Sequence, residues 1–476
     1  MSSALLRRTV ARAPRGESFD RWTAPIALGL LAVLVYANGL ANGFVLDDRG
    51  IILENPLVRE PATAWRAFLM PYWPTSVGGG QYRPLGILSF ALDQLVAGPS
   101  AAWYHAVNIA WHATATLLFW YWIRGFLAAA GALAAAALFA VHPVHVEAVA
   151  NLVGRLELMA AALIFAALIA HRRQSWFAPV LYACALLSKE HSVVFVALAL
   201  LSHAVEPRGI EGVRARRALW VAYGVVPVTW LCLMLFVVRN DPPVTSAVFQ
   251  GLATQHRLLT VVSIVPEYLR LLVVPIHLSA DYEPGVIQPM MRLSASVLLG
   301  AAVLIAWLWA VVRVWRADRV VAFAMIAVPT ALAPVSNVFF ATGVALAERT
   351  LYLASAGICV LAGRLLDTAG SRRGAMAVVA LLLVVLGGFR TWSRTPVWRD
   401  ARTFALTLLE DHPESYRGHW VAGRVLLAAG DLAAAQREFV IARRIFPGDS
   451  VLNREAAGVD STIHARAPLG VPTAAP

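Results

Sequence analysis

The chain has 476 residues, of which 59% are hydrophobic and only 14% are charged, and its mean hydropathy is +0.65. This composition excludes an ordinary soluble enzyme and is typical of a polytopic membrane protein. The formal net charge of +12 comes almost entirely from arginine, an excess that marks cytoplasmic loops in membrane proteins, so nucleic-acid binding is not implied.

The N-terminal residues 1–22 are basic and precede an apolar run at 23–42 that is long enough to cross a membrane. The segment resembles a signal sequence, but because many apolar runs follow, we expect an uncleaved first helix with a cytoplasmic N-terminus. The three cysteines, Cys184, Cys232 and Cys359, all fall in apolar stretches. They predict neither a disulfide framework nor a metal cluster.

Apolar stretches predict an all-α, polytopic membrane protein with about 11 transmembrane helices. The candidate spans are 23–42, 103–123, 126–142, 154–171, 176–188, 190–205, 218–238, 294–312, 320–338, 347–363 and 374–391. A long first extracytoplasmic loop follows the first span. The transmembrane domain is expected to cover 23–392.

The distribution of cations predicts the orientation of these helices. With the N-terminus inside, the short cytoplasmic segments carry eighteen arginines, and the much longer outer segments carry eleven cations. The stretch 256–275 is ambiguous, but a crossing there would reverse this bias for the C-terminal third. Because it also contains Pro266, Glu267, Arg270 and Pro275, we expect an interfacial or re-entrant helix.

The chain turns polar and helical after Trp392. Residues 416–449 form a 34-residue pattern whose Gly423, Ala435, Phe439 and Pro447 match positions of a tetratricopeptide repeat. One repeat cannot bury its own apolar face, so it must pack on the membrane domain, a partner or another copy. We therefore expect a repeat-like extracytoplasmic tail at 393–450, and a disordered tail at 451–476.

The first loop opens with two adjacent carboxylates, Asp47 and Asp48, at the mouth of the first span. A carboxylate in this place can accept a proton from an attacking hydroxyl, which makes both residues candidate catalytic bases. The alternative is that they only cap the next helix or stop the span. The sequence does not separate Asp47 from Asp48, although we favour Asp47 slightly.

The predicted topology brings many other ionisable groups to the outer side, where so many polar side chains near membrane depth mark a functional site. The candidate substrate-binding residues are Arg83, His105, His142, His145, Glu147, Arg155, Lys189, Glu190, Glu348 and Arg349. Arg83, Arg155, Lys189 and Arg349 together would make a pocket for a pyrophosphate or phosphate head group. Lys189 is the only lysine in the chain, and its compact ammonium suits contact with phosphate.

Each of these residues also has a structural interpretation. His142 and His145 resemble a metal-ligand pair, but Pro143 breaks the helix on which they would share a face, so hydrogen bonding to substrate is favoured and no metal site is predicted. His105 lies near the surface, whereas His112 is deeper in the helix and more typical of packing. Lys189 and Glu190 can also pair with each other, and Arg349 can simply reach the membrane interface.

Seven segments together resemble the transmembrane and tetratricopeptide-repeat-containing O-mannosyltransferases, a family within the polytopic, lipid-phosphate-sugar-dependent GT-C glycosyltransferases. The segments are FVLDD at 44–48, YRPL at 82–85, WYHAVNIAWH at 103–112, HPVHVEAVANLVGR at 142–155, LLSKE at 186–190, YLRLLVVPIHLSADY at 268–282 and AERTLYLAS at 347–355. Each is weak alone, but seven in order are specific. The single recognisable repeat departs from the several that family members usually carry.

The resemblance implies an inverting transfer of a sugar, expected to be mannose, from a polyprenyl or dolichyl phosphate to a protein hydroxyl. Asp47 or Asp48 would then be the general base, and no cofactor or divalent metal is expected. The expected partners are the lipid bilayer, the lipid-phosphate sugar and an acceptor protein or glycan. The composition leans towards a bacterial inner membrane, or the endoplasmic reticulum membrane in a eukaryote, with an extracytoplasmic active site.

Three alternatives remain open. A transporter or flippase of lipid-linked sugars also needs many spans and a basic pocket, but alternating access requires a midplane site, whereas these polar groups gather on one side. A non-catalytic membrane scaffold with a repeat tail leaves the carboxylate pair and Lys189 unexplained. A related enzyme that glycosylates a lipid or glycan fits the same residues.

Overall fold

The computed structural model describes residues 20–73, 79–205, 217–241 and 243–466. Over these ranges the chain is helical, without a β-strand, and one isolated bridge joins Gly79 and Pro243. This confirms the all-α prediction for the described ranges. Most of the basic N-terminal segment and the last ten residues of the predicted disordered tail lie outside them.

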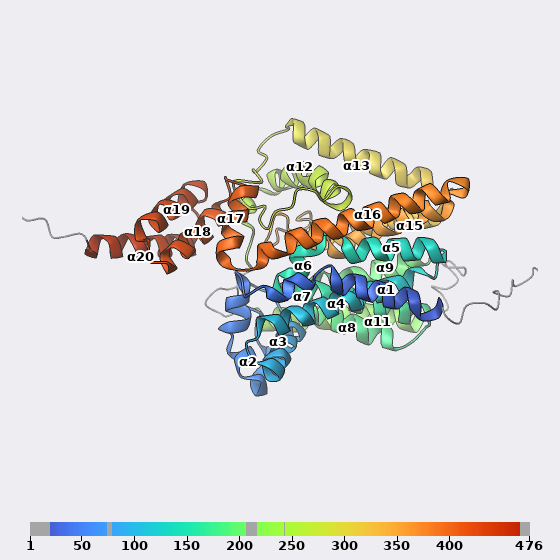
Figure 1. The fold of residues 1–476 in the computed structure, drawn as a ribbon, viewed down its shortest axis with the longest axis horizontal. Coiled ribbons are helices and arrows are strands. Elements are labelled where there is room, and N and C mark those ends of the chain that lie inside the picture. Colours follow the sequence, from blue (N-terminus) through green and yellow to red (C-terminus); the bar gives the residue numbers. More distant parts are fainter. Residues whose placement is uncertain (1–19, 74–78, 206–216, 242, 467–476) are drawn as a thin grey trace, which may run out of the picture.

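The long helices run side by side as a bundle, and the C-terminal helices project from one end of it (Figure 1). The α-helices of the bundle are α1 (Asp20–Leu34), α2 (Pro56–Arg59), α3 (Pro84–Ala97), α4 (Ala101–Ile123), α5 (Ala129–Val141), α6 (Val146–Ala150), α7 (Arg155–Arg172), α8 (Phe177–Ser188), α9 (Phe195–Ser202), α11 (Arg217–Val237), α12 (Thr254–Val273), α13 (Ala295–Val314), α14 (Arg319–Leu332), α15 (Tyr352–Thr368) and α16 (Arg373–Arg394). Short 3-10 turns include η3 (Pro61–Leu69), η4 (Pro143–His145), η5 (Leu152–Gly154), η6 (Glu190–Val194), η9 (Glu348–Leu351) and η11 (Thr395–Trp398).

Several helices are long and apolar enough to cross a membrane, so the protein is an integral, multi-pass membrane protein. In the described part of the chain there are six, or up to seven if a pair bent by 45° at His142 is one span. They are Trp22–Ala41, Leu152–Arg172, Arg217–Val237, Ala295–Val314, Glu348–Thr368 and Gly370–Trp398, with Ala129–Val141 plus Pro143–Ala150 as the bent pair.

The predicted count of about 11 spans is not confirmed. The predicted spans at 176–188, 190–205 and 320–338 correspond to the shorter apolar helices Phe177–Ser188, Glu190–Ser202 and Arg319–Val335. At 1.5 Å per residue the 12-residue α8 is about 18 Å long, well short of the ~30 Å hydrocarbon core. Helix α4 has 23 residues but is not apolar enough, because it carries His105, Asn108 and His112.

The core of the bundle is formed by α4, α5, α7 and α15. Small residues allow these helices to approach closely: a methyl group on Gly363 of α15 would lie 2.4 Å from the carbonyl oxygen of Gly131 on α5. Helices α11, α13 and α16 instead expose large apolar side chains along most of their length. An exposed apolar face of this size is expected where a helix contacts lipid.

The helix α12 is not among the helices that qualify as spans. Its buried side chains, including Val261, Ile264, Tyr268 and Leu271, recur at three- and four-residue spacing, so it is amphipathic. The loops that flank it meet again, because the Ser246 hydroxyl donates to Glu283 over 2.8 Å. These features agree with the expectation that 256–275 does not cross the membrane.

The tail consists of α17 (Ala401–Asp411), α18 (Tyr416–Ala428), α19 (Leu432–Ile445) and α20 (Ser450–Arg466). The expected hairpin at 416–449 is α18 and α19, which contact each other where Gly423 leaves room for Phe439. The structure differs from the expectation of disorder at 451–476, because 450–466 form α20. Its Leu452, Ala456 and Val459 complete the small core that the hairpin alone lacks.

Candidate functional site

The two carboxylates of the first loop follow a residue in an uncommon backbone conformation. Leu46 has φ +53°, in the left-handed region that a leucine rarely adopts. This conformation sends the two following side chains into different surroundings. Strained residues of this kind gather at functional sites.

Asp48 points into the protein and is only 1% exposed. Its Oδ2 accepts a hydrogen bond from the Val45 amide over 2.9 Å, and its Oδ1 accepts one from the Val153 amide over 3.1 Å. Burial raises the pKa of Asp48 to about 7, and the amide donors oppose this shift only in part. Asp48 therefore joins the first loop to the turn before α7.

Asp47 is partly exposed. In the described part of the chain its carboxylate has no hydrogen bond and no ion pair, yet it acts electrostatically on Arg349 and on Arg417 of the tail. It also acts on the ring hydroxyl of Tyr72. A carboxylate with free oxygens beside cations is placed to accept a proton from a bound hydroxyl.

Three predicted cations lie at helix ends, each paired with a carboxylate. The Arg83 guanidinium, just before α3, donates from Nε to both oxygens of Glu190 over 3.0 Å. The Lys189 ammonium, between α8 and η6, lies 2.6 Å from Glu157 on α7.

Arg349, in η9, is held by Glu147 of α6. Its guanidinium bonds to one carboxylate oxygen and its backbone amide donates to the other over 2.8 Å. The two partners stand 202 positions apart in the sequence. The pair thus joins the HPVHVE and AERT segments at one place.

The three cations form one cluster, because the ammonium of Lys189 interacts electrostatically with both Arg83 and Arg349. Their side chains keep 13%, 11% and 25% exposure for Arg83, Lys189 and Arg349 respectively. His191, which sequence reasoning missed, completes the cluster, with Nε2 3.4 Å from Glu157. Each cation has further N–H groups with which it can bind a phosphate oxygen.

Arg155, predicted to bind phosphate, is fully buried and belongs to the interior instead. Its guanidinium pairs with Asp93, donates to Asn108 over 2.7 Å and to the Tyr104 carbonyl over 3.0 Å, and lies over the Phe90 ring. These groups come from α3, α4 and α7. In this structure Arg155 joins three helices and offers no exposed donor.

The predicted substrate-binding histidines are also buried among helices. His142 Nε2 bonds to the Leu272 carbonyl oxygen over 3.1 Å, and His145 Nε2 to the Ser355 hydroxyl over 2.7 Å. His105 Nε2 lies 3.3 Å from the Gly43 carbonyl oxygen, and His112 bonds to Tyr352 and Ala140. Over the residues that the structure describes, no group of three or more side chains is arranged to hold a metal ion.

Glu348, the neighbour of Arg349, is buried and holds the loop between α12 and α13. Its Oε1 accepts from the Ser279 amide over 2.6 Å and from the Tyr282 hydroxyl over 2.9 Å. The same loop carries Asp281, which contacts the tail. Sequence reasoning included SADY at 279–282 in a matching segment but assigned these residues no role.

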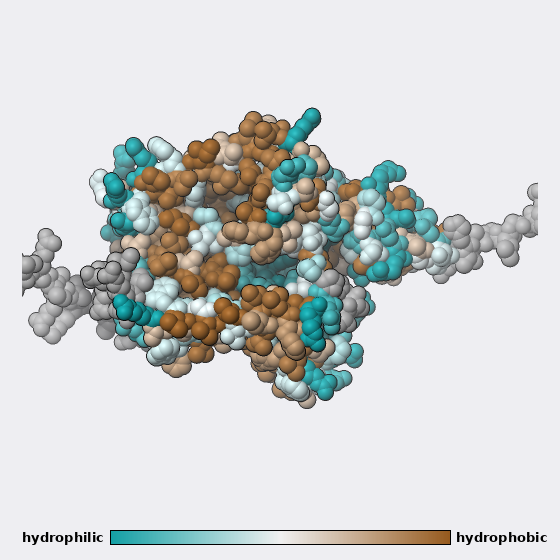
Figure 2. Space-filling model, turned by 180° about the vertical axis from the view of Figure 1, so that it is seen from behind, coloured by the Kyte–Doolittle hydropathy of each residue, from teal (hydrophilic) through white to brown (hydrophobic). Residues whose placement is uncertain are grey.

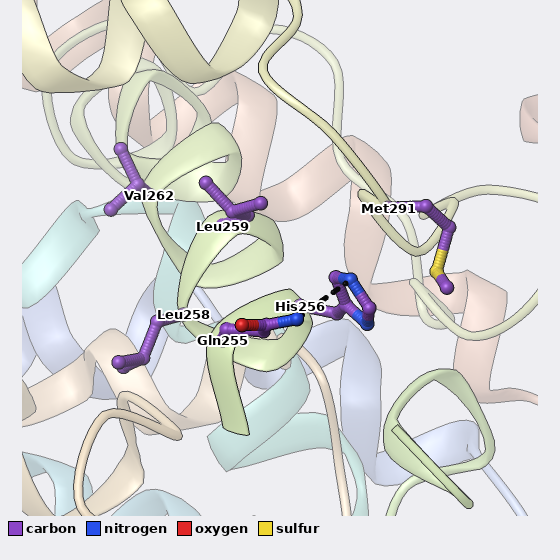
Figure 3. A pocket seen from close by; sticks show the side chains of 6 residues that line it. All are labelled: Gln255, His256, Leu258, Leu259, Val262 and Met291. Atoms are coloured by element: carbon purple, nitrogen blue, oxygen red, sulfur yellow. Dashed lines mark hydrogen bonds between the residues drawn. The ribbon is translucent and has the colours of Figure 1, made fainter. Parts of the chain in front are cut away.

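The surface is hollowed behind the bundle, and hydrophilic residues line the hollow between apolar masses (Figure 2). A separate open pocket of about 440 Å³ lies along α12, lined by Gln255, His256, Leu258, Leu259, Val262 and Met291 (Figure 3). None of these six residues belongs to the cation cluster or to the carboxylate pair. His256 is the one ionisable side chain in its lining, and no carboxylate or cation accompanies it there.

Comparisons with known proteins give relatives that share most of the chain. The protein O-mannosyl-transferase F38B6.6 of Caenorhabditis elegans is 28% identical over 88% of this chain and 62% of its own length. The protein O-mannosyl-transferase TMTC3 of Mus musculus is 26% identical over 87% of this chain and 50% of its own length. The protein O-mannosyl-transferase Tmtc2 of Drosophila melanogaster is 35% identical over 53% of this chain and 29% of its own length.

The chain thus spans 62% or less of the length of these relatives. No family model matches the chain, and no solved structure matches it. The relatives come from nematode, mouse and fly, so they do not support the expected lean towards a bacterial inner membrane.

Proposed function

Because the chain is related to the TMTC protein O-mannosyl-transferases over most of its length, we propose that it is a membrane glycosyltransferase. Its donor would be mannose on a polyprenyl or dolichyl phosphate, and its acceptor a hydroxyl group of a protein. The observation that carries the proposal is the position of Asp47, a carboxylate with free oxygens that acts electrostatically on Arg349, a member of the cation cluster with Arg83 and Lys189.

In the proposed reaction the acceptor oxygen attacks the anomeric carbon of the sugar from the side opposite the phosphate. The bond from that carbon to the phosphate oxygen breaks, its electron pair leaves with the lipid phosphate, and the hydroxyl proton passes to Asp47. One base suffices, since the phosphate is a competent leaving group without a protonating acid. The configuration at the anomeric carbon is inverted.

The cations would stabilise the negative charge that grows on the departing phosphate. Each is held in place by a carboxylate, so little reorganisation is needed when the donor binds. Arginine binds phosphate through two parallel N–H groups, and lysine acts as a point charge. Glu147, Glu157 and Glu190 would then be positioning residues that orient the cations and do not touch the sugar.

The proposal is tested with membranes that contain the wild-type protein and radiolabelled mannosyl-phosphoryl-polyprenol. We expect label to enter membrane proteins in the wild type. In Arg349→Gln, which keeps an N–H donor for Glu147, the KM for the donor should rise about tenfold or more, because a charged hydrogen bond to phosphate is lost. Arg372→Gln is the matched control, since Arg372 is exposed and lies beyond the opposite end of α15 from Arg349.

Failure of transfer with mannose, glucose and arabinose donors would contradict the proposal. If the same protein, reconstituted in vesicles, then moved a lipid-linked sugar across the bilayer, the transport alternative would replace it. Label in lipid or glycan without label in protein would keep the glycosyltransferase reaction and change the acceptor.

A further inference from the structure

Helix α18 of the repeat-like tail meets the loop between α12 and α13. The Ser415 hydroxyl, at the N-cap of α18, donates to Asp281 Oδ2 over 2.8 Å. Arg417 Nε lies 3.2 Å from Asp281 Oδ1. Gly285 has φ +103°, and a methyl group on it would lie 1.8 Å from the Glu414 carbonyl oxygen, so loop and tail are in direct contact.

The loop that receives the tail is also fixed to the membrane domain. Glu348 accepts from Ser279 and Tyr282, as described above. Glu283, on the same loop, accepts from the Ser246 hydroxyl over 2.8 Å and from the Ala345 amide over 3.0 Å. Buried hydrogen bonds on both sides of Asp281 therefore hold Arg417 at a defined place relative to the cation cluster.

These contacts leave N–H groups of the Arg417 guanidinium free to donate hydrogen bonds. Its side chain is 32% exposed, and within the described residues its Nε has a charged neighbour but no well-aligned hydrogen bond. No hydrogen bond of the described residues uses its two terminal nitrogens. Asp47 acts electrostatically on Arg417 as well as on Arg349. The first loop also contacts the start of the tail directly, because the Gly43 amide donates to the Arg399 carbonyl oxygen over 2.8 Å. The candidate base thus lies near one guanidinium from each domain.

The two guanidinium groups approach Asp47 from different parts of the molecule. Arg349 belongs to the cation cluster at the helix ends, where the proposed function places the lipid-bound phosphate. The tail projects from the end of the bundle, beyond the long helices (Figure 1). A group on α18 therefore belongs to the part of the protein outside the bundle.

We propose that Arg417 is an acceptor-binding residue, which donates hydrogen bonds to a carbonyl or carboxylate oxygen of the acceptor polypeptide beside Asp47. The tail then completes the site, so that the acceptor hydroxyl is bound at the junction of the first loop, the loop 274–294 and α18. This inference rests on the proposed transferase function.

The test uses purified full-length protein, labelled mannosyl-phosphoryl-polyprenol, and the proteins of the same membranes as acceptors. Label in protein, free mannose released by water, and the KM for the donor are measured together. In Arg417→Ala we expect label in protein to fall about tenfold or more, since charged hydrogen bonds to the acceptor are lost. The KM for the donor and the release of free mannose should stay at wild-type values.

Arg424→Ala is the matched control, because Arg424 lies on the same helix and contacts only Glu455, at 3.7 Å, among described carboxylates. It should label protein as the wild type does. If Arg417→Ala lowers the thermal midpoint, Arg417→Lys decides the matter, because it keeps the charge beside Asp281 without the two terminal NH2 groups. Restored stability with low labelling supports acceptor binding.

Three results would overturn the inference. The first is unchanged labelling in Arg417→Ala. The second is a rise in the KM for the donor, which would assign Arg417 to the phosphate. The third is full recovery of labelling in Arg417→Lys together with stability, which would show that a charge beside Asp281 is enough and that the terminal NH2 groups of Arg417 do not bind the acceptor. A wild-type protein that neither transfers nor releases mannose would instead contradict the proposed function itself.

Discussion

The neighbouring carboxylates Asp47 and Asp48 of the first loop lie in different surroundings because of the backbone conformation of the residue before them. The left-handed Leu46 turns Asp48 inward, where two amides hold it, and leaves Asp47 partly exposed, where it acts electrostatically on Arg349 and Arg417. A buried carboxyl that bonds to the backbone stabilises the loop, whereas an exposed one with free oxygens can exchange a proton. We therefore propose that Asp48 has a structural role and that Asp47 accepts the proton in the transfer reaction.

The raised pKa of Asp48 predicts a pH-dependent stability. A carboxyl whose pKa is higher in the folded than in the unfolded protein contributes stability at pH below about 4, and this contribution is lost as the pH rises to about 7. Asp48→Asn has no such titration, but its amide group replaces one acceptor oxygen. The thermal midpoint of the variant should lie below that of the wild type at pH 5, and the gap should narrow by pH 8.

Thermal unfolding in detergent from pH 5 to pH 8 measures this gap. Asp47→Asn serves as the control, because Asp47 has no hydrogen bond to lose in the described part of the chain. A gap between wild type and Asp48→Asn that stays constant with pH would show that Asp48 does not titrate in this range.

Sequence reasoning identified the carboxylate pair and the cations but did not separate their roles. Asp47 and Asp48 lie in an irregular turn, where no periodicity predicts which side chain is buried. Arg155 and the histidines of the HPVH segment are polar residues in conspicuous motifs, yet they bond to backbone and side chains of neighbouring helices. Their partners, such as Asp93 and Leu272, stand 62 and 130 positions away, which only the fold reveals.

At the scale of helices, buried polar side chains as well as apolar ones hold neighbouring helices together. The Arg155 guanidinium pairs with Asp93 and joins α3, α4 and α7. Removing one member of a buried ion pair leaves the other charge without compensation, at a cost of about 3–5 kcal/mol. We therefore expect Arg155→Ala to lower the free energy of unfolding by about this amount.

The midpoint of thermal or denaturant unfolding checks this expectation. The double variant Asp93→Leu with Arg155→Met should recover most of the loss, since it removes both charges. Arg173→Ala, at the exposed end of the same helix, should change stability little. A loss in Arg155→Ala no greater than in Arg173→Ala would mean that the pair does not hold the three helices.

Helix lengths explain why the predicted number of spans is not confirmed. Hydropathy identified apolar stretches at 176–188 and 190–205, but it does not show how long a helix is. Helix α8 ends at Ser188, and η6 begins directly after Lys189. Because α8 is about 18 Å long, it does not cross a ~30 Å core by itself. The break between the two helices is the place that presents Lys189 to the cation cluster.

At the scale of the whole molecule, the topology depends on α12. Its flanking loops meet through Ser246 and Glu283, and Arg257 near its start donates to the Asn337 carbonyl over 2.7 Å. Near its end, the Ile276 carbonyl accepts from Arg390 over 2.8 Å. We expect both ends of α12 to lie on one side of the membrane, so that the repeat-like tail lies outside and the N-terminus inside.

Single cysteines at Gln255 and Ile276, in a protein without Cys184, Cys232 and Cys359, test this topology. A membrane-impermeant maleimide added to intact cells or sealed microsomes should either label both cysteines or label neither of them. A cysteine at Arg316, in the loop between α13 and α14, should react from the opposite side. Reaction of the Gln255 and Ile276 positions from opposite sides would show that α12 crosses the membrane and would move the tail to the cytoplasm.

The most direct measurement compares Asp47→Asn and Asp48→Asn as purified full-length proteins, with transfer from labelled mannosyl-phosphoryl-polyprenol and the thermal midpoint recorded at pH 6. If Asp47 is the base, Asp47→Asn should lose about a hundredfold or more of the transfer rate and keep the wild-type midpoint. Asp48→Asn should lower the midpoint and retain transfer in the fraction that stays folded. Loss of transfer in Asp48→Asn at an unchanged midpoint, together with transfer by Asp47→Asn, would contradict the division of roles between the two carboxylates.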